Sequence, residues 1–316
     1  MAASPFPSLK TVTRTQGNNL ALKQGRASAA GFNLVFEEVP VLIDAFRRMV
    51  RGLEYDVCEM ALTTYVCARA HGKRMTALPI PLVRAFHHGA ILVNDSIREP
   101  RDLEGRRVGV NRGYTVTTGL WARQVLQQQY GVDLSKITWV LSGDEHVAEY
   151  RAPANVVPIA PGAKMAEMVV AGELAGAIGA DIDAPNVRPL IANAAEAGFQ
   201  ALRTSGHYPI NHVLVVKDEL LQAHPGIGPA LFEAFAESKR LYVEQLRAGT
   251  LVKPTAVDQM HRRVMQITAA DPLPYGIEPN RDMFQAALAA AQAQGIIDRV
   301  PALEALFPPN THRLVA

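Results

Sequence analysis

Strand-like and helix-like segments alternate along this 316-residue chain, and no other feature constrains its fold as strongly. A β-like run at residues 34–39 precedes apolar residues spaced as on one helix face at 41–51, and a second strand–helix pair covers residues 55–70. The alternation starts again at residue 107, before a helix-like segment that runs to residue 130. Strands that alternate with helices form parallel sheets covered on both faces. The sequence therefore predicts an α/β protein.

Two polar stretches divide the alternating pattern, and we expect the chain to cross between two lobes there. The first stretch covers residues 95–105, and the second begins at His207 and leads directly into an apolar strand. Residues 1–94 with 208–316 are thus expected to form lobe one, and residues 95–207 lobe two. Helices predicted near the C-terminus have alanine-rich faces, which favour packing against lobe one or another subunit. A homo-oligomer is therefore expected.

Composition excludes several classes of partner. A formal net charge of +2 with scattered basic residues gives no reason to expect a nucleic-acid partner. No apolar run approaches the roughly 20 residues needed to span a membrane. Residues 1–8 lack the basic and apolar regions of a secretory signal, so we expect a cytoplasmic protein. Cys58 and Cys67 fit neither a zinc motif nor a disulfide framework, and both are expected to be buried thiols.

Two adjacent histidines, His87 and His88, follow Arg84 and precede an apolar run that ends at Asn94. We interpret Phe86 to Asn94 as a strand entering from a turn. Neighbouring side chains of a strand point to opposite faces, so the two histidines are not expected to share the core. One of them should face a cleft, a partner or water. The alternative is one packed histidine beside one solvated histidine.

Polar residues also lie near the expected ends of strands, where parallel sheets bind ligands. The turn after Arg14 is either a ligand loop or a plain surface turn. Glu59 is either a site carboxylate or a charge favoured by the following helix start. Asp181 and Asp183 follow another strand, where they bind a cation, position a ligand hydroxyl or belong to a solvated loop.

In lobe two, the helix expected after Gly113 begins beside Arg112 and several hydroxyl side chains, among them Thr115 and Thr117. Free N–H groups at a helix start and an arginine suit a carboxylate or a phosphate. The alternative is that the threonines cap their own helix.

Histidines gather at the expected crossings, and this is the clearest functional signal in the sequence alone. His87 and His88 lie near the first crossing, and His207 and His212 lie at the second. The cluster Asp144–Glu145–His146 is able to orient a histidine or bind a metal. A metal set of His87, His88, His146 and His212 is an alternative, although its spacings match no metal motif.

The chain contains five long polar motifs. They are Tyr-Asp-Val-Cys-Glu-Met-Ala-Leu-Thr-Thr-Tyr from residue 55, Arg-Ala-Phe-His-His-Gly-Ala from 84, Asn-Arg-Gly-Tyr-Thr-Val-Thr-Thr-Gly from 111, Leu-Ser-Gly-Asp-Glu-His-Val-Ala-Glu-Tyr from 141 and His-Tyr-Pro-Ile-Asn-His from 207. These motifs resemble the 4,5-dihydroxyphthalate decarboxylase family, and the likeness extends from about Leu9 to Phe307. This resemblance implies a two-lobed fold like that of the type II periplasmic binding proteins, with a central cleft and two crossings. It further implies a cytoplasmic enzyme that converts 4,5-dihydroxyphthalate, a small aromatic dicarboxylate, to protocatechuate and carbon dioxide.

Such a reaction needs an acid near the leaving carboxyl, a base near the para hydroxyl and a clamp on the retained carboxylate. Because histidine titrates near neutral pH, we assign His88 or His87 as the acid and His212, with Glu59, to the phenol. The clamp is assigned to Arg112, whose planar fork matches a carboxylate, together with the helix start that follows it. No cofactor is expected. Arg14 and Arg84 are second candidates for the clamp, and further expected substrate contacts are Tyr114, Thr115, Thr117, His146, Asp181, His207 and Asn211.

Two rival functions remain open. One is a non-catalytic solute-binding protein for a small aromatic anion, and the other is a metal-assisted decarboxylase of a related aromatic acid.

Overall fold

The structure is a computed structural model that describes residues 6–316, so part of the N-terminal segment used to predict a cytoplasmic location lies outside it. Two compact units are present, and each contains one sheet. Unit 1 comprises Met1–Arg84, Ile210–Gln285 and Pro301–Ala316, and unit 2 comprises Ala85–Pro209 and Ala286–Val300.

Unit 1 contains a five-stranded sheet in the order β2-β1-β3-β11-β4 within the described residues. Strand β1 pairs in parallel with β2 and β3, whereas β11 returns antiparallel between β3 and β4. The predicted all-parallel sheet is therefore wrong at β11. The elements are β1 (Ser8–Val12), α1 (Leu20–Lys23), β2 (Asn33–Phe36), α2 (Leu42–Gly52), β3 (Val57–Ala61), α3 (Leu62–Ala70), β4 (Met75–Arg84), β11 (Ile210–Lys217), α7 (Asp218–Ala223), α8 (Ile227–Ala248) and α9 (Ala256–Thr268).

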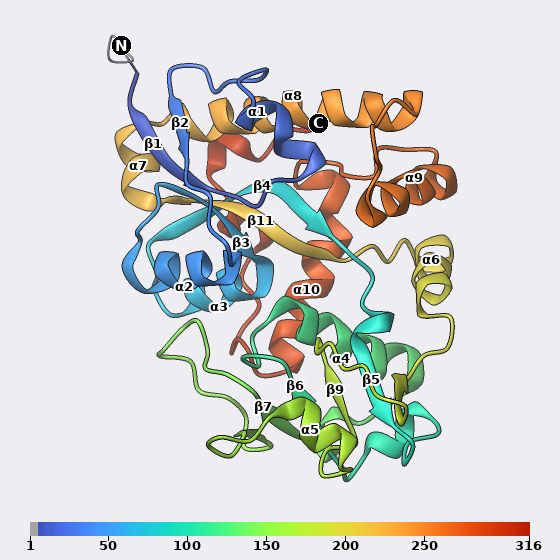
Figure 1. The fold of residues 1–316 in the computed structure, drawn as a ribbon. Helices are drawn as coiled ribbons and strands as arrows, with labels where there is room; N and C mark the ends of the chain where they lie inside the picture. The colour runs from blue at the N-terminus through green and yellow to red at the C-terminus, as the bar shows by residue number, and fades with distance from the viewer. Residues whose placement is uncertain (1–5) are drawn as a thin grey trace. The chain divides into compact units, whose positions relative to one another are not determined.

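Helices cover this sheet on both faces. Figure 1 shows α2 and α3 on one side of the strands and α1 and α8 on the other. Alternate residues of β11 pack against α8. Leu214 and Val216 of this strand belong to one buried cluster with Leu231 and Phe235 of the helix. Burial of such side chains contributes about 25 cal/mol per Å² of apolar surface. The core thus holds the ends of β3 and β11 in a fixed register.

Unit 2 contains a six-stranded sheet in the order β10-β5-β9-β6-β7-β8 within the described residues. The pairs among β6, β7, β8 and β9 are parallel, but β5 runs antiparallel to β9 and β10 antiparallel to β5. The elements are β5 (Ile91–Asn94), β6 (Arg107–Val110), α4 (Thr117–Tyr130), β7 (Thr138–Leu141), β8 (Val156–Pro158), α5 (Met165–Val170), β9 (Gly176–Ile178), β10 (Val187–Pro189) and α6 (Ala194–Ser205), and α10 (Arg281–Ala293) contains the division between Gln285 and Ala286.

The divisions between the units differ from the predicted crossings at residues 94 and 207. Two divisions fall after Arg84 and after Pro209. The reason is that β5 pairs with β9 and β10, so residues 91–94 join the sheet of unit 2. The expectation that residues 208–316 all belong to lobe one is wrong for Ala286–Val300, which belongs to unit 2. At the end of α2, Leu53 takes the left-handed conformation, with φ of 48°.

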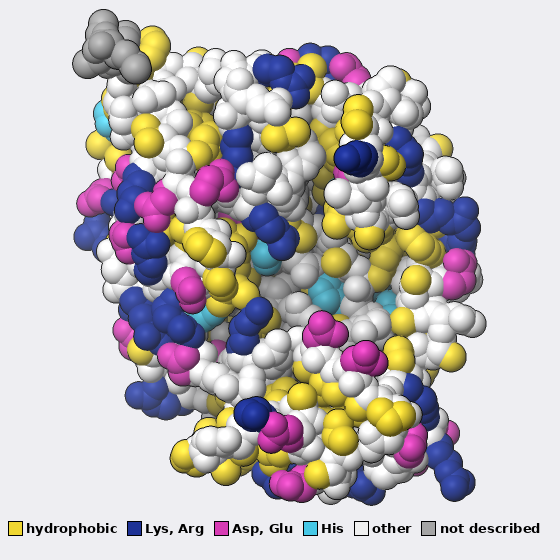
Figure 2. Space-filling model, viewed as in Figure 1, with side chains coloured by type: hydrophobic (Ala, Val, Ile, Leu, Met, Phe, Trp, Pro, Cys, Tyr) yellow, Lys and Arg dark blue, Asp and Glu magenta, His cyan; other side chains and the backbone are white. Residues whose placement is uncertain are grey.

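The surface charges agree with the scattered pattern of the sequence. Figure 2 shows Lys and Arg side chains interspersed with Asp and Glu on the face that it draws. Among residues 6–316, no helix is both long enough and apolar enough to cross a bilayer. The expected buried thiols are confirmed, because Cys58 and Cys67 are both buried and are not joined in a disulfide. The homo-oligomer and the cytoplasmic location stay predictions.

Candidate active site

A buried carboxylate and a histidine pair on neighbouring strands of unit 1. Glu59 on β3 is fully buried, and its Oε1 lies 2.6 Å from Nδ1 of His212 on β11. In the antiparallel register His212 is opposite Ala61 and Leu214 is opposite Glu59, so the pair is a diagonal one. Diagonal neighbours are within reach of long side chains. The strand register therefore brings together two residues that are 153 positions apart.

This contact orients the imidazole. Because a carboxylate accepts hydrogen bonds, the contact with Glu59 favours the tautomer of His212 that carries its hydrogen on Nδ1, which leaves Nε2 as an acceptor. The ring of Phe46 packs against the imidazole edge-on, with centroids 5.2 Å apart. The His212 side chain is 17% exposed, which leaves part of the ring accessible. The arrangement has the elements of an oriented general base.

The turn after β1 completes the environment of Glu59. Its Oε2 accepts a hydrogen bond from the backbone N–H of Arg14 at 2.9 Å and one from Nε2 of Gln16 at 3.5 Å. Asn19 closes the turn, because its Nδ2 donates to the Arg14 carbonyl and its Oδ1 accepts from the Gln16 N–H. The sequence reading of this turn as a ligand loop stays a prediction. The backbone of the turn donates a hydrogen bond to the Glu59 carboxylate, while the Arg14 side chain is exposed.

The other predicted residues of unit 1 are buried. Arg84, at the end of β4, is 5% exposed and donates from Nη2 to Oδ1 of Asn280. The Nδ2 of Asn280 in turn donates to the carbonyls of Pro274 and Gly276. Asn211 is 8% exposed. Arg84 is thus tied into a network that joins β4 to the loop before α10.

In unit 2, the expectation that His87 and His88 do not share the interior is wrong. Both are buried, with exposed fractions of 3% and 0%. The predicted strand from Phe86 begins only at Ile91, because residues 88–90 form a 3₁₀ turn and His87 has ψ of 6°. The alternation of a strand therefore does not apply to this pair. Local backbone curvature turns both imidazoles inward.

Burial changes the acid–base behaviour of two unit 2 histidines. Desolvation lowers the pKa of His88, although the hydrogen bond between its Nε2 and Gln129 Oε1 opposes this shift. Desolvation, followed by the charge of His88, lowers the pKa of His207 to about 4. His207 packs edge-on against Trp121, with centroids 5.6 Å apart. Both imidazoles are therefore mainly neutral at pH 7.

The predicted helix start before α4 is present, and a carboxylate of the chain itself lies against it. Tyr114, Thr115 and Thr117 are buried, whereas Arg112 is exposed and has a positive φ of 73°. The backbone N–H of Arg112 donates to Ser142 Oγ at 2.7 Å. The N–H groups of Tyr114 and Thr115 both donate to Glu145.

The remaining predicted residues of unit 2 differ in exposure. His146 is 5% exposed, whereas Asp181 lies on the surface, as in the solvated-loop reading. Among the described residues, no group of three or more His, Cys, Asp or Glu side chains is arranged to hold a metal ion. The convergence of His212 with the histidines of unit 2 stays a prediction.

Three residues that contact or neighbour the predicted site residues were not predicted from the sequence. Gln16 reaches Glu59, Gln129 bonds His88, and Arg123 is a fully buried cation inside α4. Only Arg123 had a usable signal, since a lone basic residue stands among apolar neighbours on its helix. The two glutamines belong to polar stretches that resemble ordinary surface segments.

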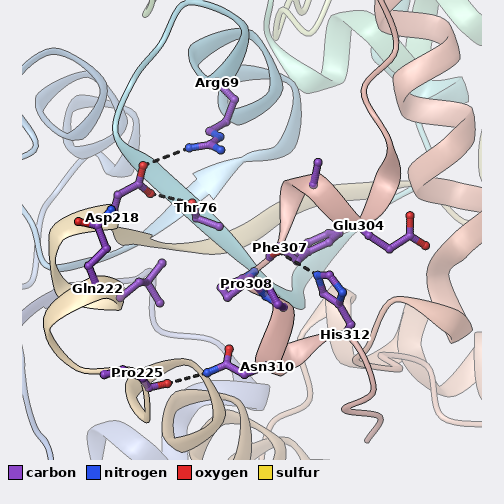
Figure 3. A pocket seen from close by; sticks show the side chains of 13 residues that line it. Arg69, Thr76, Asp218, Gln222, Pro225, Glu304, Phe307, Pro308, Asn310 and His312 are labelled. Carbon is purple, nitrogen blue, oxygen red and sulfur yellow. Dashed lines mark hydrogen bonds and ion pairs between the residues drawn. The ribbon is translucent and has the colours of Figure 1, made fainter.

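A separate cavity of about 620 Å³ lies in unit 1. It is located beside Thr76, near the start of β4, and Asp218, just after β11, so it lies at the opposite end of these strands from Arg84 and His212. Figure 3 shows Asp218 bonded to both Arg69 and Thr76. None of the residues predicted from the sequence is among those that line this cavity.

Comparisons with solved structures identify the fold. The alkanesulfonate-binding protein SsuA from Xanthomonas axonopodis pv. citri, bound to MOPS, is 16% identical and gives a TM-score of 0.52, with 97% of this chain and 99% of that chain covered. The desulfurization enzyme DSZB is 15% identical, with a TM-score of 0.56 over 96% and 97% of the two chains.

A Candida albicans gene product with the generic periplasmic binding protein fold is 13% identical, with a TM-score of 0.51 over 94% and 93%. These neighbours confirm the predicted periplasmic-binding-protein-like class of fold.

No family model matches the sequence. A 4,5-dihydroxyphthalate decarboxylase from Pseudomonas putida is 34% identical over 146 residues, which are 43% of this chain and 56% of that protein. A 4,5-dihydroxyphthalate decarboxylase from Comamonas testosteroni is 30% identical over 284 residues, which are 84% of this chain and 86% of that protein. This second match extends over residues of both units, because neither unit alone holds 84% of the chain. The chain therefore belongs to the 4,5-dihydroxyphthalate decarboxylase family, a family of carboxy-lyases.

Proposed function

We propose that this protein converts 4,5-dihydroxyphthalate to protocatechuate and carbon dioxide. The proposal is carried by the Glu59–His212 pair, a buried carboxylate that orients a partly exposed imidazole, in a member of this decarboxylase family. Relatives named for this reaction support the substrate.

The reaction needs no organic electron sink. Each carboxyl of the substrate is para to a hydroxyl, and removal of that hydroxyl's proton makes the carboxyl-bearing carbon electron-rich. An acid then protonates this carbon, which gives a dienone-like intermediate. Cleavage of the bond to the carboxylate releases carbon dioxide and returns its electron pair to the ring, so aromaticity is restored.

His212 accepts the phenol proton at Nε2 in this proposal. Glu59 stabilises the imidazolium through the contact at Nδ1, and the arrangement returns the proton to the phenolate after carbon dioxide has left. His87 or His88 supplies the proton to the ring carbon. Since its pKa is lowered, His88 fits this role less well at neutral pH than an imidazole with an ordinary pKa.

Arg112 binds the retained carboxylate, because it is exposed beside the helix start of α4 and its guanidinium presents a planar fork. Arg14 and Arg84 are the alternative clamps. Of these two, Arg14 has an exposed side chain, whereas Arg84 is buried and bonded to Asn280.

Incubation of the purified protein with 4,5-dihydroxyphthalate, with protocatechuate measured by chromatography and carbon dioxide by headspace analysis, tests the proposal. Equal amounts of the two products are expected. Binding of the substrate without turnover would contradict it and support the alternative of an aromatic-anion-binding protein. Activity lost on dialysis against a chelator and restored by a divalent ion would instead support the metal-assisted alternative.

A further inference from the structure

The segment Gly113–Thr115 holds a carboxylate that belongs to the chain itself. Glu145 accepts hydrogen bonds from the N–H of Tyr114 to Oε1, from the N–H of Thr115 to Oε2 at 3.2 Å, and from the Thr115 hydroxyl to Oε2 at 2.6 Å. A Cβ at residue 113 would lie 2.5 Å from Oε2 of Glu145. Glycine is therefore what allows the carboxylate to approach this backbone so closely.

A buried cation lies beneath the same segment. Arg123 on α4 is 0% exposed, its Nη2 donates to the Tyr114 carbonyl at 2.8 Å, and its guanidinium stacks on the Tyr114 ring at 3.8 Å. Its Nη1 has no hydrogen-bond partner and lies 2.9 Å from where a Cβ on Gly119 would be, in the first turn of α4. An unsatisfied N–H of a buried cation is costly.

The two observations indicate an electropositive site. The start of the 14-residue helix α4 carries a partial positive charge, and the buried guanidinium adds a full charge against the same turn. Two backbone donors and one hydroxyl converge on the two oxygens of a single carboxylate. This donor set would suit an external aromatic carboxylate equally well, because carboxylates share the same acceptor geometry.

We propose that Gly113–Thr115 is the site for the retained carboxylate of the substrate and that Glu145 is an internal competitor for it. This inference rests on the proposed function and deepens it. An aromatic dicarboxylate must displace Glu145, so the Glu145 side chain lowers the affinity for all such anions. Arg123 is a positioning residue that holds the Tyr114 carbonyl and keeps the segment in place.

Titration calorimetry with phthalate, which lacks the hydroxyls needed for turnover, tests the proposal on the full chain. The Glu145→Gln variant keeps an acceptor but loses the charge, so its Kd for phthalate should fall about tenfold, equivalent to 1.4 kcal/mol. Glu149→Gln is the matched control, because it removes one exposed negative charge from the same segment. This control should leave the Kd unchanged.

A second variant separates competition from a structural role. Thr115→Val in the Glu145→Gln background removes the hydroxyl donor and should raise the Kd for phthalate again. An unchanged or weaker affinity in Glu145→Gln, or an equal gain in Glu149→Gln, would overturn the proposal. Because phthalate binding needs no turnover, tighter binding in Glu145→Gln would support this site even if 4,5-dihydroxyphthalate were not decarboxylated.

Discussion

Nδ1 of His212 lies 2.6 Å from Oε1 of Glu59, and the second oxygen of this buried carboxylate accepts the backbone N–H of Arg14. A carboxylate held by two separate segments cannot rotate freely, so the imidazole that it contacts is held as well. The distance between the two side chains is set by β3 and β11, because the register of these strands fixes where each residue lies.

Removal of either member of this pair should reduce turnover strongly. We expect His212→Asn to lower kcat for 4,5-dihydroxyphthalate about 10²- to 10⁴-fold, because proton transfer contributes on this scale. Glu59→Gln should lower kcat less and shift the pH profile, since the imidazolium loses its anionic partner. Steady-state kinetics between pH 5 and 9 measure both effects. His224→Gln, on another part of unit 1, should retain normal rates, and a normal rate in His212→Asn would exclude its role.

The acid assignment is tested by the neighbouring histidines of unit 2. If His87 donates the proton, His87→Ala should reduce kcat about 10²- to 10⁴-fold. His88→Ala should have a smaller effect on kcat, because burial lowers the pKa of this group and favours its neutral form. The kcat of each variant is measured after circular dichroism has verified its fold. Near-normal rates in both variants would place the acid elsewhere.

The clamp assignment predicts a change in binding rather than in chemistry. Arg112→Ala should raise KM roughly tenfold or more with little change in kcat, because a charge-assisted hydrogen bond contributes about 1.5–3 kcal/mol. Arg106→Ala, another exposed arginine of unit 2, is the control and should leave KM unchanged. An unchanged KM in Arg112→Ala would transfer the clamp to Arg14 or Arg84.

Gly17 connects the turn beside Glu59 to the aromatic ring of Tyr242 on α8. A Cβ at this position would overlap that ring, so Gly17→Ala should displace the turn and destabilise the protein by about 1–3 kcal/mol. The displaced turn would loosen Glu59, so kcat should fall at least about tenfold. Thermal unfolding and kinetics measure these effects. Gly52→Ala is the control, since a Cβ at this position would meet no atom within 4 Å apart from its chain neighbours and the backbone of its own helix. Equal stability of the two variants would contradict the prediction.

The burial of His261 leads us to predict that the protein loses stability in acid. Desolvation lowers its folded-state pKa to about 4, against opposing contributions from Asp258 and Asp271, whereas the unfolded chain has the ordinary value near 6.5. Between these two values the unfolded state binds more protons, so the free energy of unfolding falls as the pH drops from about 6.5 to 4. The shift corresponds to about 3 kcal/mol for this one group.

His261→Gln should therefore flatten the dependence of stability on pH in this window, as measured by urea unfolding at pH 4.5, 5.5 and 7. His224→Gln, whose ring is partly exposed and contacts Phe32 edge-on, should leave the slope unchanged. A slope in His261→Gln as steep as in the unmodified protein would show that other groups cause the acid instability.

Sequence alone determined the class of the fold and most of its elements. The strand–helix pair predicted at residues 55–70 is present as β3 and α3, and the segment predicted from residue 107 to residue 130 is present as β6 followed by α4. Periodicity and turn residues carry this information because they depend on neighbours in the chain. The family was also recognisable, since its polar motifs are continuous in sequence.

Only the tertiary structure decided which side chains meet. The antiparallel return of β11 places His212 beside Glu59, and no local pattern records the partner of a strand. The burial of His87 and His88 depends on a short 3₁₀ turn that the apolar run conceals. Likewise, Glu145 reaches the segment before α4 across about 30 residues. Such contacts arise from packing between distant segments, and so their geometry is absent from the sequence until the chain has folded.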